Sequence, residues 1–339
     1  MSFSETSSPS NQEAVMSAIR TFATANGWTE NHWVTAAGSV NGRGVFTITR
    51  GVTTVTFRWD GTDADNIVIH HALAYPGGLT ADQKEKPFDF ATDSGNGTTS
   101  ILALVSERRV ANIGSGPYVK LTLMSDTSPH YVYCVLEYQS GKFRHFGFGD
   151  GLEEQIGNWT GGGFVAGQVW SGSGPSTPQL AAHTVLFDGA GSGTQSERAT
   201  INVEGLGGQI AAEKFGVSTT GTSDPTGTDV SGNNYHGISG GIRATMFCRN
   251  FQQFVPDPLS GVIELTPALL MFKRRSSNQY QALGFLPGVR MCQLRNFNAA
   301  EEVVVGGTTW KFFPVTAKSN VGGSNEESEN MGLAYKKVV

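Results

Sequence analysis

The residues best suited to acid–base catalysis lie near the middle of the chain, where Asp150 is followed closely by Glu153 and Glu154. Glycoside hydrolases use two carboxyl groups held a fixed distance apart across a cleft. Acids that are neighbours in sequence do not establish such a spacing, and they are more typical of a solvated loop. A depolymerase that uses carboxylates such as Asp150 and Glu153 therefore stays a third interpretation, behind two non-catalytic ones.

The segment Phe146–Gly151, FGFGDG, has a glycine spacing that superficially resembles a nucleotide-binding loop. The full dinucleotide-binding pattern is absent, and no helical pattern follows the glycines. The alternation of Phe and Gly instead predicts a strand that carries aromatic side chains on one face. The sequence also contains no Walker A motif, no HExxH and no GxSxG, so we expect no cofactor and no enzymatic activity.

Two motifs could contribute metal ligands. Asp60, Asp63 and Asp65 lie in DGTDADN, and their carboxylate oxygens suit a hard cation. The motif lacks EF-hand spacing, and clusters of Asp, Asn and Gly are ordinary turn residues, so a turn is favoured and cation binding stays open. His70 and His71 are adjacent, but neighbours on a strand point to opposite faces and cannot share one metal ion.

Two tryptophans stand among glycine and threonine, Trp159 and Trp170. Both are expected to be exposed. Exposed indole rings can stack on sugars, which would suit binding of a host surface glycan, and they are also enriched in subunit interfaces. Of these two roles the interface is favoured.

The composition restricts the function classes. Gly accounts for 44 of 339 residues, and charged residues for 16%, well below the ~25% typical of globular proteins. The formal net charge is −5 and the longest basic run is Lys273–Arg275, so no dominant contact with nucleic acid is expected. The N-terminus lacks the apolar core of a signal peptide, and no segment approaches the ~20 apolar residues of a membrane span.

The three cysteines are Cys134, Cys248 and Cys292. They are widely spaced, form no CxxC motif and each has apolar neighbours. We expect three buried free thiols in a chain that folds in a reducing cytoplasm.

One helix is predicted, at residues 10–26, by an apolar stripe at helical spacing. Ser10 and Glu13 have the spacing of a capping box, and Asn26–Gly27 provides a stop. The stripe is expected to pack against a sheet.

Strand patterns dominate the rest of the chain, with hairpin turns expected at Arg50–Gly51, Gln139–Lys142 and Gly306–Gly307. Val52–Trp59 alternates apolar and polar residues and predicts a half-buried strand. The hairpin Tyr131–Phe148 has apolar residues on both faces, which predicts a sheet covered on both sides. The other expected strands are Gly44–Arg50, Ile67–Ala74, Ile101–Ile113, Tyr118–Met124, Thr184–Phe187, Thr200–Val203, Ile242–Cys248, Val262–Leu265, Tyr280–Phe285, Val303–Val305, Thr308–Val315 and the end of the tail.

Together these patterns predict a mainly β fold with antiparallel, sandwich-like sheets, one N-terminal helix and long loops rich in Gly, Ser and Thr. Residues 1–170 are expected to form the helix and a β domain in which glycine-punctuated loops follow the central hairpin. Residues 171–240 are rich in turn residues and predict an insertion or arms that reach other subunits. Residues 241–339 are expected to supply strands that complete the core.

Several blocks resemble those of uncharacterised virion structural proteins of tailed double-stranded DNA bacteriophages. The longest are YVYCVLEYQSGKFRHFGFGD and NWTGGGFVAG, and GTTWKFFPVTAKS, SENMGLAYKK and the TANGW that ends the helix resemble the same proteins. The resemblance covers about a third of the chain and consists of aromatic and glycine patterns. It implies a β-rich fold in an assembled phage particle, and it supplies no catalytic residue.

The sequence therefore predicts a non-enzymatic structural subunit of a tailed phage virion, assembled in the cytoplasm of the bacterial host. A tail, baseplate or fibre-attachment component is favoured, ahead of a neck, collar or capsid-surface protein. Its expected partners are other virion proteins and copies of itself. A host-adsorption module that binds carbohydrate through Trp159 and Trp170 is the alternative from a different functional class.

Overall fold

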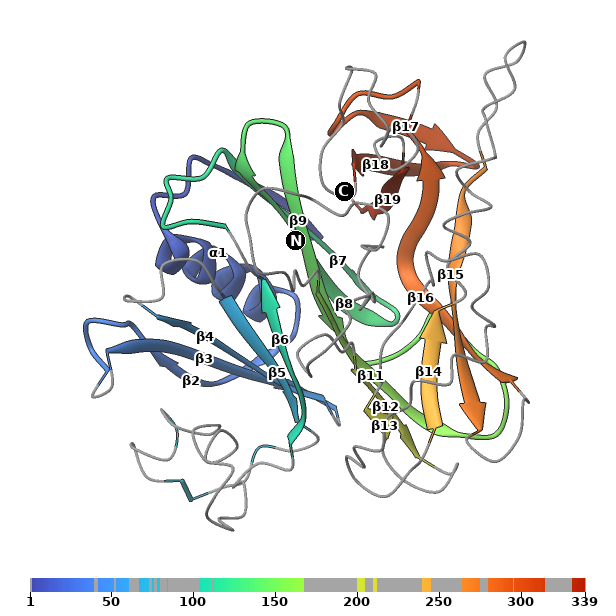
Figure 1. Cartoon of the computed structure of the whole chain (residues 1–339), viewed down its shortest axis with the longest axis horizontal. Helices are drawn as coiled ribbons and strands as arrows, with labels where there is room; N and C mark the ends of the chain where they lie inside the picture. The colour runs from blue at the N-terminus through green and yellow to red at the C-terminus, as the bar shows by residue number, and fades with distance from the viewer. Residues whose placement is uncertain are drawn as a thin grey trace, which may run out of the picture.

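The computed structural model describes residues 2–39, 42–51, 53–60, 67–72, 75, 78–79, 84, 104–110, 113–167, 200–204, 210–211, 240–244, 264–274, 280–294, 296–314 and 331–338. These residues form antiparallel sheets and a helix near the N-terminus, which confirms the predicted mainly β fold class. The sheets stack in three layers (Figure 1).

The middle layer, the central sheet, is built mainly from the first half of the chain. Its strands lie in the order β1 (Phe3–Ser7), β7 (Lys120–Thr127), β8 (His130–Gln139), β9 (Lys142–Gly149), β11 (Thr160–Gly167), β12 (Thr200–Glu204) and β13 (Ile210–Ala211).

A second sheet, the helix-side sheet, covers one face of the central sheet together with the helix. It consists of β2 (Thr29–Val34), β3 (Arg43–Arg50), β4 (Thr53–Asp60), β5 (Ile67–Ala72) and β6 (Leu104–Val110). The third, the C-terminal sheet, covers the other face in the order β14 (Gly240–Ala244), β15 (Thr266–Arg274), β16 (Tyr280–Gln293), β19 (Met331–Lys337), β18 (Thr308–Pro314) and β17 (Glu302–Val305), with β10 (Glu154–Gln155) paired to β16.

The predicted helix is α1 (Gln12–Ala25), and its apolar stripe is buried as expected. Its start differs from the prediction. The N-cap is Asn11, whose side-chain oxygen accepts a hydrogen bond from the Ala14 amide at 2.9 Å, so the Ser10–Glu13 capping box is wrong. The Glu13 carboxylate instead accepts a hydrogen bond from the Ala36 amide at 3.3 Å.

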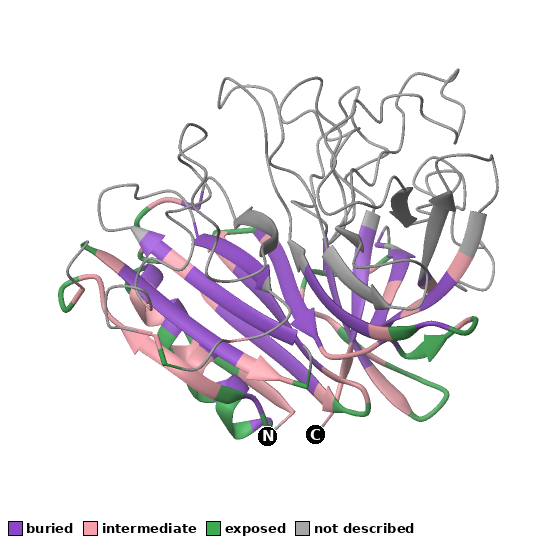
Figure 2. Cartoon of the chain, turned by 90° about the horizontal axis from the view of Figure 1, so that it is seen from below, coloured by how far each residue is buried: buried purple, intermediate pink, exposed green. Residues whose placement is uncertain are grey.

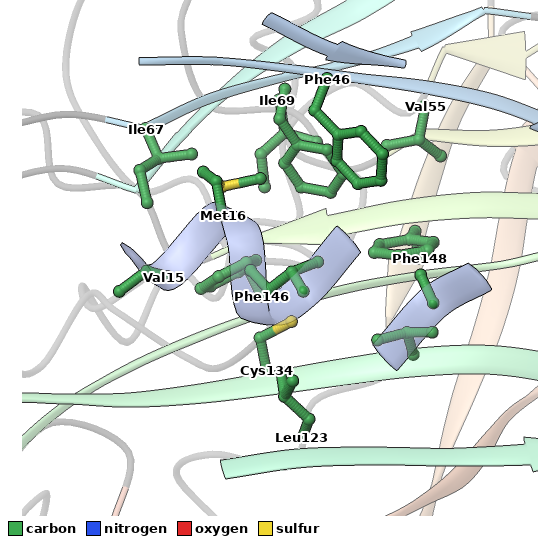
Figure 3. Packing of buried hydrophobic residues seen from close by; sticks show 14 of the residues in the cluster. Val15, Met16, Phe46, Val55, Ile67, Ile69, Leu123, Cys134, Phe146 and Phe148 are labelled. Carbon is green, nitrogen blue, oxygen red and sulfur yellow. The ribbon is translucent and has the colours of Figure 1, made fainter. Parts of the chain in front are cut away.

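The helix fills one end of the space between the central and helix-side sheets. Figure 3 shows Met16 pointing toward Phe46 and Ile69 of the helix-side sheet, with Phe146 and Cys134 of the central sheet on the opposite side of the helix. The cluster that these side chains belong to is almost entirely apolar and buried, and it forms the main core of the molecule (Figure 2).

The three hairpin turns occur where the sequence predicts them. β3 pairs with β4, and Gly51 takes a φ of +53° in the turn. Gln139 pairs with Lys142 across the β8–β9 turn. Gly306 and Gly307 have φ values of +58° and +79°, as a two-residue turn between strands requires.

The β4 strand is more buried than expected. Its apolar residues face the core. Thr54 and Thr56 on the opposite face, and Thr53 at the start of the strand, are also at most 1% exposed. The Thr56 hydroxyl lies 2.9 Å from that of Thr47 on β3, and this hydrogen bond satisfies both groups in the interior. The prediction of a half-buried strand is therefore wrong, because threonine was read as a solvent-facing residue.

The central hairpin is covered on both sides, as predicted. All residues from Tyr131 to Leu136 are buried. Val132, Cys134 and Leu136 belong to the main core, whereas Tyr133 on the opposite face contacts Tyr335 of β19 with ring centroids 5.3 Å apart.

Two predictions after this hairpin need revision or extension. Residues 160–167, expected as glycine-rich loop, form β11 in the central sheet. β12 confirms the expected strand at Thr200–Val203, and β12 and β13 extend the central sheet, so part of 171–240 belongs to that sheet. The rest of 171–199 and 212–239, including Thr184–Phe187, lies outside the described residues, and the three-part division of the chain stays a prediction.

In the C-terminal part, strands were expected in the right neighbourhoods but with imperfect bounds. β17, β18 and β19 confirm Val303–Val305, Thr308–Val315 and the tail. β16 is 14 residues long and extends well beyond Tyr280–Phe285. β15 starts at Thr266, just after the strand expected at Val262–Leu265.

Candidate functional site

The carboxylates with catalytic potential are bound to arginines of the outer layers. Asp150 accepts a hydrogen bond from the Arg50 guanidinium of β3 at 3.0 Å and another from the His130 amide at 2.9 Å. Arg50 also donates to the Gly27 carbonyl. Asp150 therefore connects the central sheet to the helix-side sheet and to the end of α1.

Glu153 is held within the C-terminal sheet, where its amide donates to the Phe285 carbonyl of β16. Its two carboxylate oxygens accept hydrogen bonds from the Arg290 guanidinium of β16, both at 2.9 Å. A bidentate pair of this kind fixes both side chains in one orientation. Asp150 therefore fastens two layers together, Glu153 fastens the segment before β10 to β16, and the two carboxylates are bound by different arginines.

The FGFGDG segment is the strand that the Phe–Gly alternation predicts. Phe146 and Phe148 on β9 point into the main core. Gly147 and Gly149 lie on the opposite face, where a Cβ would come within 2.3 Å of a ring carbon of Tyr133 or Phe164, respectively. The glycines leave room for these aromatic rings, so the segment is a packing motif.

A buried histidine joins the central and C-terminal sheets. His145 on β9 lies between Pro314 and Tyr335, with Nε2 at 2.9 Å from the Pro314 carbonyl oxygen and Nδ1 at 2.8 Å from the Tyr335 hydroxyl. A carbonyl can only accept, so Nε2 carries the proton and the Tyr335 hydroxyl donates to Nδ1. Burial lowers the pKa of His145 to about 4, against the raising effect of the Pro314 carbonyl and with the help of nearby Arg144. The imidazole is therefore neutral at pH 7.

A buried lysine forms a second junction at the start of the chain. Lys311 on β18 is 5% exposed. Its ammonium group lies 2.7 Å from Glu302 of β17 and 3.4 Å from Glu5 of β1. Lys337 on β19 also binds Glu302, at 2.8 Å, and its ammonium group lies 4.4 Å from the centre of the Phe3 ring.

This charge cluster stabilises the ionised form of Glu302. Partial burial alone would raise the pKa of Glu302, but the hydrogen bonds and charges of Lys311 and Lys337 outweigh that effect and lower it. The cluster brings the open edges of two layers together, because β1 ends the central sheet and β17 ends the C-terminal sheet.

The expectation of an exposed Trp159 is wrong. The side chain is 2% exposed, and its indole N–H donates to the Ile156 carbonyl at 2.8 Å. Gly162, with a φ of +101°, lies close against the ring. Trp159 therefore stabilises the turn into β11 and presents no platform for a sugar. Trp170 lies outside the described residues.

The metal motifs gain no support among the described residues, which contain no cluster of three His, Cys, Asp or Glu side chains that could hold an ion. His70 and His71 are both buried neighbours on β5, and burial lowers the pKa of His71 to about 3. Asp60 ends β4, whereas Asp63 and Asp65 lie outside the described residues.

The cysteine prediction is confirmed for Cys134 and Cys292, which are buried free thiols. Cys134 belongs to the main core and Cys292 to a smaller cluster on the C-terminal sheet. Burial raises the pKa of both thiols, which makes the reactive thiolate scarce at pH 7. Cys248 lies outside the described residues.

Among the described residues, three large hydrophobic side chains are exposed: Val304 by 67%, Val305 by 45% and Val119 by 40%. The first two belong to β17 and flank its turn to β18. Sequence reasoning identified this hairpin but not its open apolar edge, which a run of three valines before Gly306–Gly307 could have indicated.

A comparison of the sequence with protein-family models gave no match, and neither did a search of curated proteins. The described part of the chain contains no helix that is both long and apolar enough to span a bilayer.

Proposed function

We propose that this protein is a structural subunit of a tailed phage virion and that its role is to build surfaces for assembly. The virion setting depends on the resemblance of the Tyr131–Gly167 block and the C-terminal blocks to phage structural proteins. A tail, baseplate or fibre-attachment position is the first choice, and a neck, collar or capsid-surface position is the second.

The observation that supports a non-catalytic role is that both candidate catalytic carboxylates form ion pairs with arginines. Asp150 and Glu153 are each bound to an arginine of a different outer sheet. Glycoside hydrolysis needs two carboxyl groups that face each other across one cleft. Here each carboxylate is instead held by its own arginine, and the two arginines belong to different sheets.

The same layers suit a component that must keep its shape under load. Directional contacts join the central sheet to the sheets on both of its faces, through Arg50–Asp150 on one side and through His145–Tyr335 and Lys311–Glu5 on the other. Because Trp159 is buried, a carbohydrate-binding module would have to depend on Trp170 or on other residues that the structure does not describe.

The experiment is quantitative mass spectrometry of gradient-purified particles together with the soluble fraction of the same infected culture. We expect this chain in the particles at a fixed copy ratio to the major virion proteins. A nonsense mutation in its gene should yield incomplete particles, and supplying the wild-type chain in trans should restore them. Its absence from purified particles, despite its presence in the soluble fraction, would refute the proposal.

A further inference from the structure

Within the described part of the chain, the β17–β18 hairpin leaves a defined set of backbone groups without a partner strand. Residues that flank a two-residue turn exchange both of their backbone hydrogen bonds, and bonded and non-bonded pairs then alternate. The pairs Val305–Thr308 and Val303–Trp310 are therefore the bonded ones. Hydrogen bonds between the Ala300 and Phe312 backbones and between Phe312 and Glu301 continue the alternation.

The N–H and C=O groups of Glu302 and Val304 consequently point away from β18. β17 is the last of the described strands of its sheet, so these groups face away from that sheet. The Val304 side chain beside them is 67% exposed. An open edge with exposed apolar side chains is a template for pairing with another strand.

Two other edge strands, β2 and β1, are less suited to pairing. On β2 the register shifts between Glu30 and His32, and such a bulge disrupts the row of backbone groups. On β1, the Ser8 amide donates to the Val119 carbonyl and the Ser125 amide donates to the Ser2 carbonyl. The backbone groups of the even-numbered residues therefore face β7, and those of Glu5 lie at the centre of the outward edge. A second β1 centred there would bring two Glu5 carboxylates face to face, which is destabilising.

We propose that β17 pairs antiparallel with β17 of a second copy of this chain, about a two-fold axis that passes between the two Val303 residues. This register bonds Glu302 of each copy to Val304 of the other, in both directions, and so uses all four outward groups of each strand. The proposal deepens the assembly role proposed above by naming one contact surface and its partner.

The charges of the hairpin are compatible with self-pairing. Each Glu302 is already bound by Lys311 and Lys337 of its own chain. In the proposed register it lies beside Val304 of the second copy, not beside the other Glu302. The two Val303 side chains meet on the opposite face of the sheet, where Val303 already packs against the smaller apolar cluster that contains Trp310.

The proposed contact is small, so the free protein is expected to dimerise only weakly. A strand of four residues buries far less than the ~1,200 Å² of a standard stable interface. We therefore expect weak pairing of the free protein that strengthens at high concentration or beside other contacts. Trapping by a disulfide detects such a contact more reliably than the oligomeric state alone.

The test is register-specific cross-linking of purified full-length protein that carries Val303→Cys in a Cys248→Ser background, since Cys134 and Cys292 are buried. Val303 would form a non-hydrogen-bonded pair across the axis, with Cα atoms about 4.5 Å apart, which a disulfide can span. The matched control is Val305→Cys, whose two copies would be displaced by about 13 Å along the strands.

Under mild oxidation at high protein concentration, Val303→Cys should form dimers at least about 10-fold faster than Val305→Cys, a difference that geometry imposes on disulfide formation. Equal rates for the two variants, or no dimer of Val303→Cys, would overturn the proposal. The urea midpoint of each cysteine variant verifies that it is folded.

A second pair of variants separates backbone pairing from apolar contact. Adding Val304→Pro to Val303→Cys removes the outward N–H but no hydrogen bond within the hairpin, and it should suppress the cross-link. Adding Val304→Ala keeps the N–H and should retain most of it. Suppression by both would mean that the side chain, and not the strand edge, makes the contact.

The same cross-linking in a lysate of infected cells, under the same mild oxidation, identifies the partner. A disulfide to a different virion protein in place of a second copy would contradict the self-pairing. These outcomes are independent of the virion proposal, because the purified protein can pair whether or not it enters particles, and it can enter particles without pairing through β17.

Discussion

The face of the central sheet that meets α1 and the helix-side sheet is packed almost entirely with apolar side chains, whereas the face that meets the C-terminal sheet contains buried tyrosines, a histidine and a lysine. On the first face Phe57 and Phe148 meet edge to face, with centroids 5.5 Å apart. On the second, His145 and Tyr335 stack at 5.8 Å and also share a hydrogen bond.

The two faces are therefore held together by different forces. Burial of apolar surface is non-directional and depends little on pH or salt. Hydrogen bonds and ion pairs between layers are directional, and they fail when a group changes its protonation state or is left without its partner. We therefore expect the attachment of the C-terminal sheet to respond to pH through His145, whereas His71 on β5 adds a pH response within the helix-side sheet.

The largest effect is expected from truncation on the apolar face. Phe146 is fully buried in the main core, and Phe146→Ala should destabilise the protein by about 3–5 kcal/mol because it removes buried surface and leaves a cavity. Urea denaturation measures the change. Val304→Ala, at an exposed position, is the control and should shift stability by less than about 0.5 kcal/mol. A Phe146→Ala variant of unchanged stability that fails only in host attachment would mean that this hairpin is a binding surface.

The next effect is a pH dependence that originates on the polar face. His145 has a pKa of about 4 when folded and about 6.5 when unfolded. The unfolded state therefore binds its proton first, so the stability from this group is complete above about pH 6.5 and is lost as the pH falls toward 4. The loss amounts to about 3 kcal/mol.

Denaturation midpoints between pH 7 and 4 test this expectation. His145→Gln should flatten part of the profile and leave the contribution of His71, whose pKa is lowered in the same direction. Tyr335→Phe, which removes the hydrogen-bond donor but leaves the titrating group, should lower stability at every pH. If wild type and His145→Gln gave parallel profiles, the neutral histidine would not be the source of acid sensitivity.

A smaller effect is expected at the buried ammonium group. Lys311→Met removes the charge that Glu5 and Glu302 share. The loss of hydrogen bonds to a charged group should cost about 1–3 kcal/mol. The pKa of Glu302, followed by NMR, should rise in the variant because one of its two lysine partners is gone. An unchanged pKa would show that Lys337 alone sets the ionisation of Glu302.

The smallest effect is expected for the bidentate pair at the surface. Glu153 is partly exposed, with 41% of its side chain accessible, and exposed ion pairs contribute about 0–1 kcal/mol. A double-mutant cycle with Glu153→Gln and Arg290→Gln should give a coupling energy in that range, which falls as salt is added. A coupling energy above about 2 kcal/mol would mean that this ion pair contributes more to stability than an exposed ion pair does.

The sequence predicted the fold class, the helix and most strands because these depend on local periodicity and turn chemistry. The helical stripe, the Gly306–Gly307 turn and the apolar hairpin Tyr131–Phe148 each carry their signal within a few residues. The predictions were wrong where exposure was inferred from residue type or from neighbouring residues alone. Buried threonines on β4 were expected to face solvent, and Trp159, surrounded by small polar residues, was expected to be exposed.

The junctions between layers could not be predicted, because their partners are far apart in the chain. His145 and Tyr335 are 190 residues apart. The only local sign of such a junction is a charged residue in an apolar strand. Lys311 follows Trp310 and precedes two phenylalanines. Such a residue indicates a buried ion pair but does not name its partner.

The central claim, that this chain is a structural component of a tailed phage particle, is tested most directly by a density map of the intact particle. We expect density for the three stacked sheets at symmetry-related positions in the tail, baseplate or fibre-attachment region, with neighbouring protein in contact. A map whose tail, neck and capsid density is fully explained by other chains would contradict it.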